Sequence, residues 1–322
     1  MKTNKIIAGA LSLCIMGTNF IGLNTNAADI AASGQCGDNA YWSLDSEGTF
    51  TVTGTGATWS WDFGAAYIFA GDMEIQWDDF EPMPWFEIRD QIKRVVIGEG
   101  ITGLGDVIFW DCDNLTSVEF PSTLTTTLGS FECCDNLRNI RFPEGMEDIG
   151  WGSFLFCSSM SSVELPESVS TIGLFAFDGM ASLSRIVISN PECTIYDSID
   201  TINNISYADS EELPFAGVII GYYGSTAQAY AEKYGITFKA IEDFSLGDVN
   251  LDGEVNALDA SMALTEYASV ATGKGSVLYD YQETFANVNG DSAVNSLDAS
   301  YILGYYAYTA IGGYLSFEEY MK

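Results

Sequence analysis

The middle of the chain repeats one hydrophobic pattern about every 23 residues. A phenylalanine opens each copy, with spacings of 23, 22, 23 and 23 between Phe86, Phe109, Phe131, Phe154 and Phe177. Apolar residues follow six, nine and eleven positions later, and mostly polar residues alternate with the last two. This alternation predicts one short strand in each copy, near residues 94–97, 117–120, 139–142, 162–165 and 185–188. Proline follows the strand in three copies and ends it, because proline has no N–H for the ladder.

A unit of this size cannot bury its own apolar face, so the copies are expected to stack on a shared core. Cysteine stands three residues after the phenylalanine in three copies, at Cys112, Cys134 and Cys157. Interior cysteines behave as small hydrophobes, which favours reduced core residues. Neighbouring rungs lie roughly 5 Å apart, so a disulfide between rungs stays open.

The alternate strand positions point away from the core and have two interpretations. They form either a ligand surface or a ladder of charges, with Glu119, Arg141 and Glu164 of alternating sign on successive rungs. The charge ladder is the favoured interpretation for these three residues.

A second duplication lies near the C-terminus. The segments that start at Asp248 and Asn287 are 39 residues apart and share 12 of 22 aligned positions. Oxygen side chains recur at loop positions 1, 3, 5, 9 and 12, the spacing that wraps an EF-hand-like loop around calcium. Magnesium fits less well, because it gives up its water shell reluctantly. The expected ligands, including the backbone carbonyls of Glu254 and Ala293, are Asp248, Asn250, Asp252, Glu254, Asn256, Asp259, Asn287, Asn289, Asp291, Ala293, Asn295 and Asp298.

The two loops differ in charge. The first has three carboxylates among its expected ligands, whereas the second has only Asp291 and Asp298 and carries Ser292 where the first has Gly253. Fewer charges weaken calcium binding. We therefore expect two calcium ions, with the first site the tighter.

Composition narrows the possible chemistry. Forty-five acidic residues against twelve basic ones give a net charge of −33, which disfavours nucleic acid as a partner. The chain has no histidine, and this removes Ser-His-Asp catalysis and histidine-ligated metal sites. Carboxylate chemistry, oxygen-ligated metals and recognition remain.

The N-terminus is typical of an export signal. Lys2 and Lys5 precede an apolar run over residues 6–16, and Ala27 and Ala28 offer a cleavage site. We expect residues 1–28 to be removed, although a buried N-terminal element is the alternative. No later run is long and apolar enough for a transmembrane anchor, so secretion is expected.

The segments "DVIFWDCDNLTSVEFPSTL" and "GSFLFCSSMSSVELPESV" resemble the leucine-rich repeats of BspA-like surface proteins. The flanks are similar too, "CGDNAYWSLDSEGTFTVTGTGA" before the repeats and "GYYGSTAQAYAEKYGITF" after them. The resemblance implies a leucine-rich-repeat β-solenoid that binds other molecules without catalysis. Its expected parts are a β-rich N-terminal cap with an acidic and aromatic insertion over 29–85, repeats with a C-terminal cap over 86–241, and a linker over 242–246.

The paired acidic loops, each followed by a helix-forming run, resemble a type I dockerin over residues 247–308, leaving a tail over 309–322. The resemblance implies a small all-α domain that binds a cohesin module of a scaffoldin and so joins a cellulosome. Leu264 and Leu303 have helix packing as an alternative to partner contact. The residues that correspond to family contact positions are Ala257, Leu258, Leu264, Thr265, Ser296, Leu297, Leu303 and Gly304.

Two functions follow from these features. The first is a secreted, non-catalytic cellulosome component whose repeats bind a protein, a cell surface or a plant-wall polymer. The alternative is a glycoside hydrolase or carbohydrate-binding subunit. Hydrolysis needs only two carboxylates, and the region around residues 62–87 has several, beside tryptophans that could stack on sugars. They are Asp72, Glu74, Asp78, Asp79 and Glu81, with Trp61, Trp77 and Trp85. No separate catalytic domain is recognisable, so enzymatic activity is the weaker hypothesis.

Overall fold

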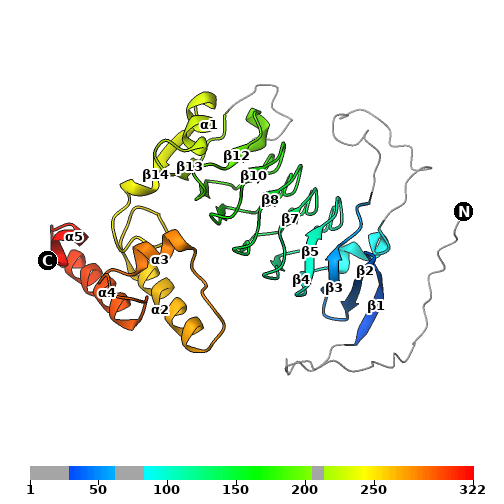
Figure 1. Cartoon of the computed structure of the whole chain (residues 1–322), viewed down its shortest axis with the longest axis horizontal. Coiled ribbons are helices and arrows are strands. Elements are labelled where there is room, and N and C mark those ends of the chain that lie inside the picture. The colour runs from blue at the N-terminus through cyan, green and yellow to red at the C-terminus, as the bar shows by residue number, and fades with distance from the viewer. Residues whose placement is uncertain (1–28, 62–82, 139, 205–213) are drawn as a thin grey trace, which may run out of the picture.

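The computed structural model describes residues 29–61, 83–138, 140–204 and 214–322 (Figure 1). The expected signal segment, Asn139 and most of the acidic and aromatic insertion lie outside these residues.

Three antiparallel strands begin the described chain: β1 (Ile30–Gln35), β2 (Asn39–Asp45) and β3 (Thr49–Ala57). Strand β2 alternates exposed and buried residues, as expected for a sheet with one face on a core. Trp42 on β2 stacks on Phe50 of β3 with ring centres 5.2 Å apart. This apolar face continues into the core of the repeats.

Strand β3 starts two ladders of parallel strands, because it pairs with both β4 and β5. The first ladder is interrupted after its second strand. Along its face lie β4 (Arg94–Ile97) and β6 (Ser117–Glu119), which continue from β3, and then a separate four-stranded sheet of β9 (Ser162–Leu165), β11 (Arg185–Ile188), β13 (Val218–Gly221) and β14 (Thr237–Ala240). We call this face the strand face. The second ladder contains β5 (Ile101–Leu104), β7 (Thr126–Thr127), β8 (Asp148–Ile149), β10 (Thr171–Ile172) and β12 (Thr194–Ile195).

Four of the five predicted strands are present within one residue, and residues 140–142 of the third copy have no assigned strand. The second ladder was not predicted. Its sequence signal is weak but periodic: from β7 onward its two-residue strands lie 17 and 18 residues after each repeat phenylalanine.

The core of the repeats is a column of stacked rings. Phe109, Phe131, Phe154 and Phe177 are fully buried, with neighbouring ring centres 5.2, 5.5 and 5.7 Å apart. Phe86 differs from the expected pattern. It is only half-buried in the 3-10 helix η2 (Phe86–Gln91), and the neighbouring Trp85 is buried against Phe109 instead.

The three cysteines at the recurring repeat position, Cys112, Cys134 and Cys157, are buried and reduced. All six described cysteines are free thiols. The Sγ atoms of Cys134 and Cys157 donate to the carbonyls of Phe109 and Phe131, each over 3.1 Å. The interpretation as reduced core residues is therefore the one the structure supports.

A helix and a strand follow the last repeat: α1 (Thr226–Tyr234) and β14. The expected linker, residues 242–246, starts at the second residue of the 3-10 helix η4 (Ile241–Asp243), directly after the buried Ile241. Another 3-10 helix, η3 (Ile199–Thr201), lies near the end of the second ladder.

The C-terminal helical module contains α2 (Ala257–Ala271), α3 (Asp280–Ala286), α4 (Ser296–Ala310) and α5 (Phe317–Tyr320). Asn256 and Asn295 cap α2 and α4, each with a reciprocal bond to the aspartate three residues later. The tail packs into the module, because Phe317 is buried with Ile302 and Val249. Figure 1 shows these helices beside the C-terminal half of the strand stack. Within the described residues, no helix has both the length and the apolar character needed to cross a membrane.

Candidate functional site

The first acidic loop, residues 248–259, folds around two buried carboxylates. Asp259 accepts from the N–H groups of Val249, Asn250 and Asn256 over 2.8, 3.1 and 2.9 Å. Asp248, only 1% exposed, accepts from the N–H groups of Asp252 and Gly253. The loop therefore brings its first and last expected ligands into its interior.

The second acidic loop, residues 287–298, repeats this arrangement. The buried Asp298 accepts from the N–H groups of Asn289 and Asn295 over 3.2 and 2.9 Å. Asn287 replaces the first aspartate, and its Nδ2 donates to the carbonyl of Asp291. Its Oδ1 is buried without a hydrogen-bond partner among the described residues. An unsatisfied oxygen at a predicted ligand position fits a cation site.

The charges of the first loop also fit a cation. Burial raises the pKa of Asp248 to about 6, with a further contribution from the Asp259 and Asp252 carboxylates and opposition from the N–H of Gly253. Burial likewise raises the pKa of Asp259. Across the described ranges, no three carboxylates or thiols gather as a metal site by themselves. The fit depends on amide and carbonyl oxygens, which are suitable calcium ligands.

The helices after the loops present matched surfaces. Leu258 and Leu297 are 55% and 48% exposed, and Leu264 and Leu303 are each 42% exposed. Ala257, Thr265 and Ser296 are also exposed. Gly304 is half-buried, and a Cβ there would lie 2.9 Å from the Tyr320 hydroxyl. The two surfaces are therefore alike except where α5 approaches α4.

Two family models match the chain. Residues 84–213 match six copies of the BspA-type leucine-rich repeat, and residues 246–305 match the type I dockerin domain. The chain joins a BspA-type leucine-rich repeat region to a type I dockerin domain. Type I dockerin domains bind calcium and pair with cohesins, so the loops and helices described above form the candidate site.

Among solved structures, the chain is similar to a leucine-rich repeat protein from Eubacterium ventriosum, with 24% identity and a TM-score of 0.42 over 60% of this chain and 45% of that one. It is also similar to a T. pallidum leucine-rich repeat protein, with 20% identity and a TM-score of 0.33 over 62% and 94%. The chain thus spans less than half of the Eubacterium ventriosum protein. Comparison with curated proteins gave no match.

The dockerin domain lies against the strand face of the repeats. The guanidinium of Arg141 stacks over the ring of Tyr279, 4.1 Å from its centre. The Tyr279 hydroxyl is 3.2 Å from both the N–H and the carbonyl of Phe142. Nε2 of Gln282 donates to Glu164 over 3.0 Å. Tyr279 and Gln282 are each only 2% exposed, so this is a closely packed contact.

An apolar cluster extends the same contact. It joins Val187 and Ile220 of the strand face to Leu251, Tyr279 and Tyr281 of the dockerin domain. Sequence reasoning missed all three dockerin residues, because none of them is a calcium position or a helix position that the family resemblance identifies. A possible signal is the departure from the duplication at Leu251, whose counterpart is Gly290.

The three residues of the expected charge ladder, Glu119, Arg141 and Glu164, pair with other residues and not with one another. Glu164 pairs with Arg185 over 2.6 Å, Glu119 pairs with Arg94, and Arg141 lies 3.6 Å from Glu144. Arg141 does not join Glu119 to Glu164, because its guanidinium is turned toward Tyr279 and donates to the Leu278 carbonyl.

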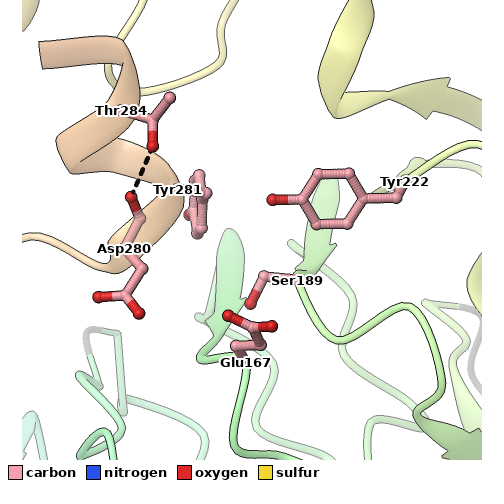
Figure 2. Close-up of a pocket in the computed structure, with 6 residues that line it drawn as sticks. All are labelled: Glu167, Ser189, Tyr222, Asp280, Tyr281 and Thr284. Carbon is pink, nitrogen blue, oxygen red and sulfur yellow. Dashed lines mark hydrogen bonds between the residues drawn. The ribbon is translucent and has the colours of Figure 1, made fainter.

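A small cavity remains between the repeats and the dockerin domain. It measures about 190 Å³ and is lined by Glu167, Ser189, Tyr222, Asp280, Tyr281 and Thr284. Figure 2 shows Glu167 and Ser189 on the repeat side facing Asp280 and Tyr281 on α3. The Thr284 hydroxyl donates to the Asp280 carbonyl over 3.1 Å, within α3.

The residues proposed for a carbohydrate site are only partly described. Trp85 is fully buried and donates its ring N–H to the Ile108 carbonyl, so it cannot stack on a sugar. Trp59 is 38% exposed, and Trp61 is packed against the core. Trp77 and the carboxylates Asp72, Glu74, Asp78, Asp79 and Glu81 lie outside the described residues.

Proposed function

We propose that this protein is a secreted, non-catalytic cellulosome component. Its dockerin domain binds a cohesin module of a scaffoldin in a calcium-dependent way. Its leucine-rich repeats, a β-solenoid behind a β-rich N-terminal cap, bind a protein, a cell surface or a plant-wall polymer. The observation that supports this best is the duplicated loop-and-helix unit, in which each acidic loop ends in a buried aspartate and each following helix carries matched exposed leucines.

Each acidic loop is proposed to hold one calcium ion in an EF-hand-like arrangement. The first would use Asp248, Asn250, Asp252, Asn256 and Asp259 with the carbonyl of Glu254. The second would use Asn287, Asn289, Asp291, Asn295 and Asp298 with the carbonyl of Ala293. The first site is proposed to be tighter, because three of its ligands are carboxylates against two in the second.

The proposed calcium ions would neutralise buried charge and so stabilise the domain. Without a cation, the buried Asp248 carboxylate is repelled by the nearby carboxylates of Asp259 and Asp252, and burying charge in this way costs free energy. Coordination energy then becomes folding energy. The loop N–H groups already orient Asp248 and Asp259, so the chain itself organises the ligand set.

The cohesin surface is proposed to comprise Ala257, Leu258, Leu264 and Thr265 after the first loop, and Ser296, Leu297, Leu303 and Gly304 after the second. Exposed leucines on a rigid helix are suitable anchors for a protein partner. These positions lie apart from the described contacts with the repeats, which come from the turn before α3, from α3 itself and from the first loop. The repeats therefore leave both candidate surfaces accessible.

The open part of the strand face is the proposed ligand surface of the repeats. Its N-terminal rungs carry the exposed pair of Arg94 and Glu119. Its C-terminal rungs are covered by the dockerin domain. A ligand of the repeats would thus meet the rungs near β4 and β6.

The decisive experiment is calorimetric titration of cohesin modules into the chain without its proposed signal segment, with calcium and with chelator. Nanomolar to micromolar binding that chelator abolishes would support the proposal. Binding that survives chelator, or no binding to any type I cohesin, would refute the dockerin part. A glycan array and a turnover assay on wall polysaccharides test the carbohydrate-binding and hydrolase alternatives on the same material.

A further inference from the structure

The strand face contacts the first acidic loop at a position where the two loops differ. Leu251, at loop position 4, is only 3% exposed and packs in one cluster with Val187, Ile220 and Ile241 of the repeat region. Its counterpart in the second loop is Gly290, which is exposed. The duplication is therefore interrupted where the loop meets the repeats.

Both residues have a left-handed backbone, with φ of 53° at Leu251 and 68° at Gly290. Glycine adopts this region without strain, whereas a leucine there is strained by its Cβ. Burial of the Leu251 side chain against the strand face offsets that strain. The first loop is thus held in its conformation partly by the repeats.

A polar contact joins the same loop to the strand face. The Arg185 guanidinium on β11 donates to the backbone carbonyl of Asn250, at loop position 3, and pairs with Glu164 over 2.6 Å. The N–H of Asn250 donates to the Asp259 carboxylate over 3.1 Å. Asn250 thus connects Arg185 on the strand face to Asp259, the last expected ligand of the loop.

We propose that calcium binding in the first loop and docking of the dockerin domain on the strand face stabilise each other. This inference rests on the calcium sites of the proposed function. A cation would fix the loop backbone that presents Leu251 and the Asn250 carbonyl to the repeats. By linkage, docking then raises the calcium affinity of the first loop by the same factor. The repeats act as an intramolecular partner of the first loop.

The coupling has a consequence for the strand face. Loss of calcium from the first loop weakens the contact that covers the C-terminal rungs. Arg141, Glu164 and Arg185 then become available to an external ligand of the repeats. Calcium occupancy therefore sets how much of the strand face is open.

The test is calorimetric titration of calcium into the full chain and into Arg185→Ala. Arg185 belongs to the repeats, so the change alters no expected ligand. Arg94→Ala is the matched control, because Arg94 occupies the same repeat position and also pairs with a glutamate, Glu119. We expect Arg185→Ala to weaken the first site about fivefold or more, the lower range of allosteric coupling. The second site and the Arg94→Ala protein should keep their affinities.

The variant Asp298→Ala removes an expected ligand of the second loop. The calcium-binding step that it abolishes in the titration is therefore assigned to the second site, and the remaining step to the first. A further variant, Leu251→Gly, keeps every expected ligand and suits the left-handed backbone. The double variant Arg185→Ala with Leu251→Gly should lose less first-site calcium binding free energy than the two single variants lose together, since both changes disrupt one contact. If Arg185→Ala and Leu251→Gly both leave the first-site affinity within about twofold, the coupling is wrong while the calcium sites stand. If the chain binds no calcium, the coupling and the calcium part of the proposed function both fail.

Discussion

The guanidinium of Arg141 on the strand face lies over the ring of Tyr279, with 4.1 Å between the guanidinium carbon and the ring centre. Arg141 also donates to the Leu278 carbonyl over 3.2 Å. The repeat periodicity assigns Arg141 to an open surface, but in the structure Arg141 contacts the dockerin domain of the same chain. The dockerin domain and the repeats form a specific contact through this pair.

Removing the Tyr279 ring should weaken that contact. Tyr279→Ala deletes the stack on Arg141, both backbone contacts at Phe142 and part of the apolar cluster. We expect the dockerin domain and the repeats to melt in two separate calorimetric transitions in this variant, and in one cooperative transition in the unmodified chain with calcium. Tyr267→Ala is the control, since Tyr267 is 45% exposed on α2. Identical thermograms for the two variants would contradict the prediction.

The stability of the repeats should depend on the ring column. Phe131 is fully buried between Phe109 and Phe154, with ring centres at 5.2 and 5.5 Å. Phe131→Ala should lower the free energy of unfolding by about 3–5 kcal/mol, as lost burial and the resulting cavity do for core phenylalanines. Urea denaturation gives the value. Phe86→Ala, outside the column, should cost less, and a loss below about 1 kcal/mol for Phe131→Ala would show that Phe131 is not a core residue.

Two buried acids should make the repeats less stable as pH rises. Burial, with the nearby Asp106 carboxylate, raises the pKa of Glu132 from 4.5 to about 7. Burial, with Asp200, raises the pKa of Asp178 from 3.8 to about 7. The folded state then holds protons that the unfolded chain has released, so the stability present at low pH is lost as pH rises through about 7.

The measurement is the urea midpoint, at pH 5 and pH 8, of the transition in which the repeats unfold, whether or not the dockerin domain unfolds with them. We expect a lower midpoint at pH 8, and a smaller difference in Glu132→Gln and Asp178→Asn. Glu147→Gln, at an exposed site, controls for the loss of one negative charge. A midpoint that rises between pH 5 and pH 8 would mean that other groups dominate this range.

Sequence periodicity was sufficient for four of the five strands predicted in the first ladder, because each of them places alternate apolar residues in a shared core. It was insufficient for the second ladder, since two-residue strands such as β8 leave almost no alternation to detect. The two acidic loops could be located from their oxygen spacing, and the structure buries Asp248, Asp259 and Asp298 at their ends. Calcium coordination by these residues stays a prediction. The docking contact could not be predicted, since Tyr279, Arg141 and Leu251 come from separate segments whose proximity depends on the folded chain.

The last prediction concerns how the dockerin domain meets its proposed cohesin partner. Leu258 and Leu297 stand at the same position of the two copies and have similar exposure, 55% and 48%. A module with this internal symmetry can present either helix to the same cohesin surface after a half-turn. Disrupting one surface then removes one of two equivalent modes, which costs only RT ln 2, about 0.4 kcal/mol.

We therefore expect Leu258→Asp or Leu297→Asp alone to weaken cohesin binding little, and the double change to abolish it. The symmetry is imperfect, because Thr265 is exposed whereas Gly304 lies under the Tyr320 hydroxyl. The surface after the first loop should thus be somewhat preferred, and Leu258→Asp should cost slightly more. Calorimetry of both single variants against one cohesin measures this. Near-complete loss of affinity in one single variant and none in the other would establish a single binding mode, set by α5 where it narrows the surface on α4.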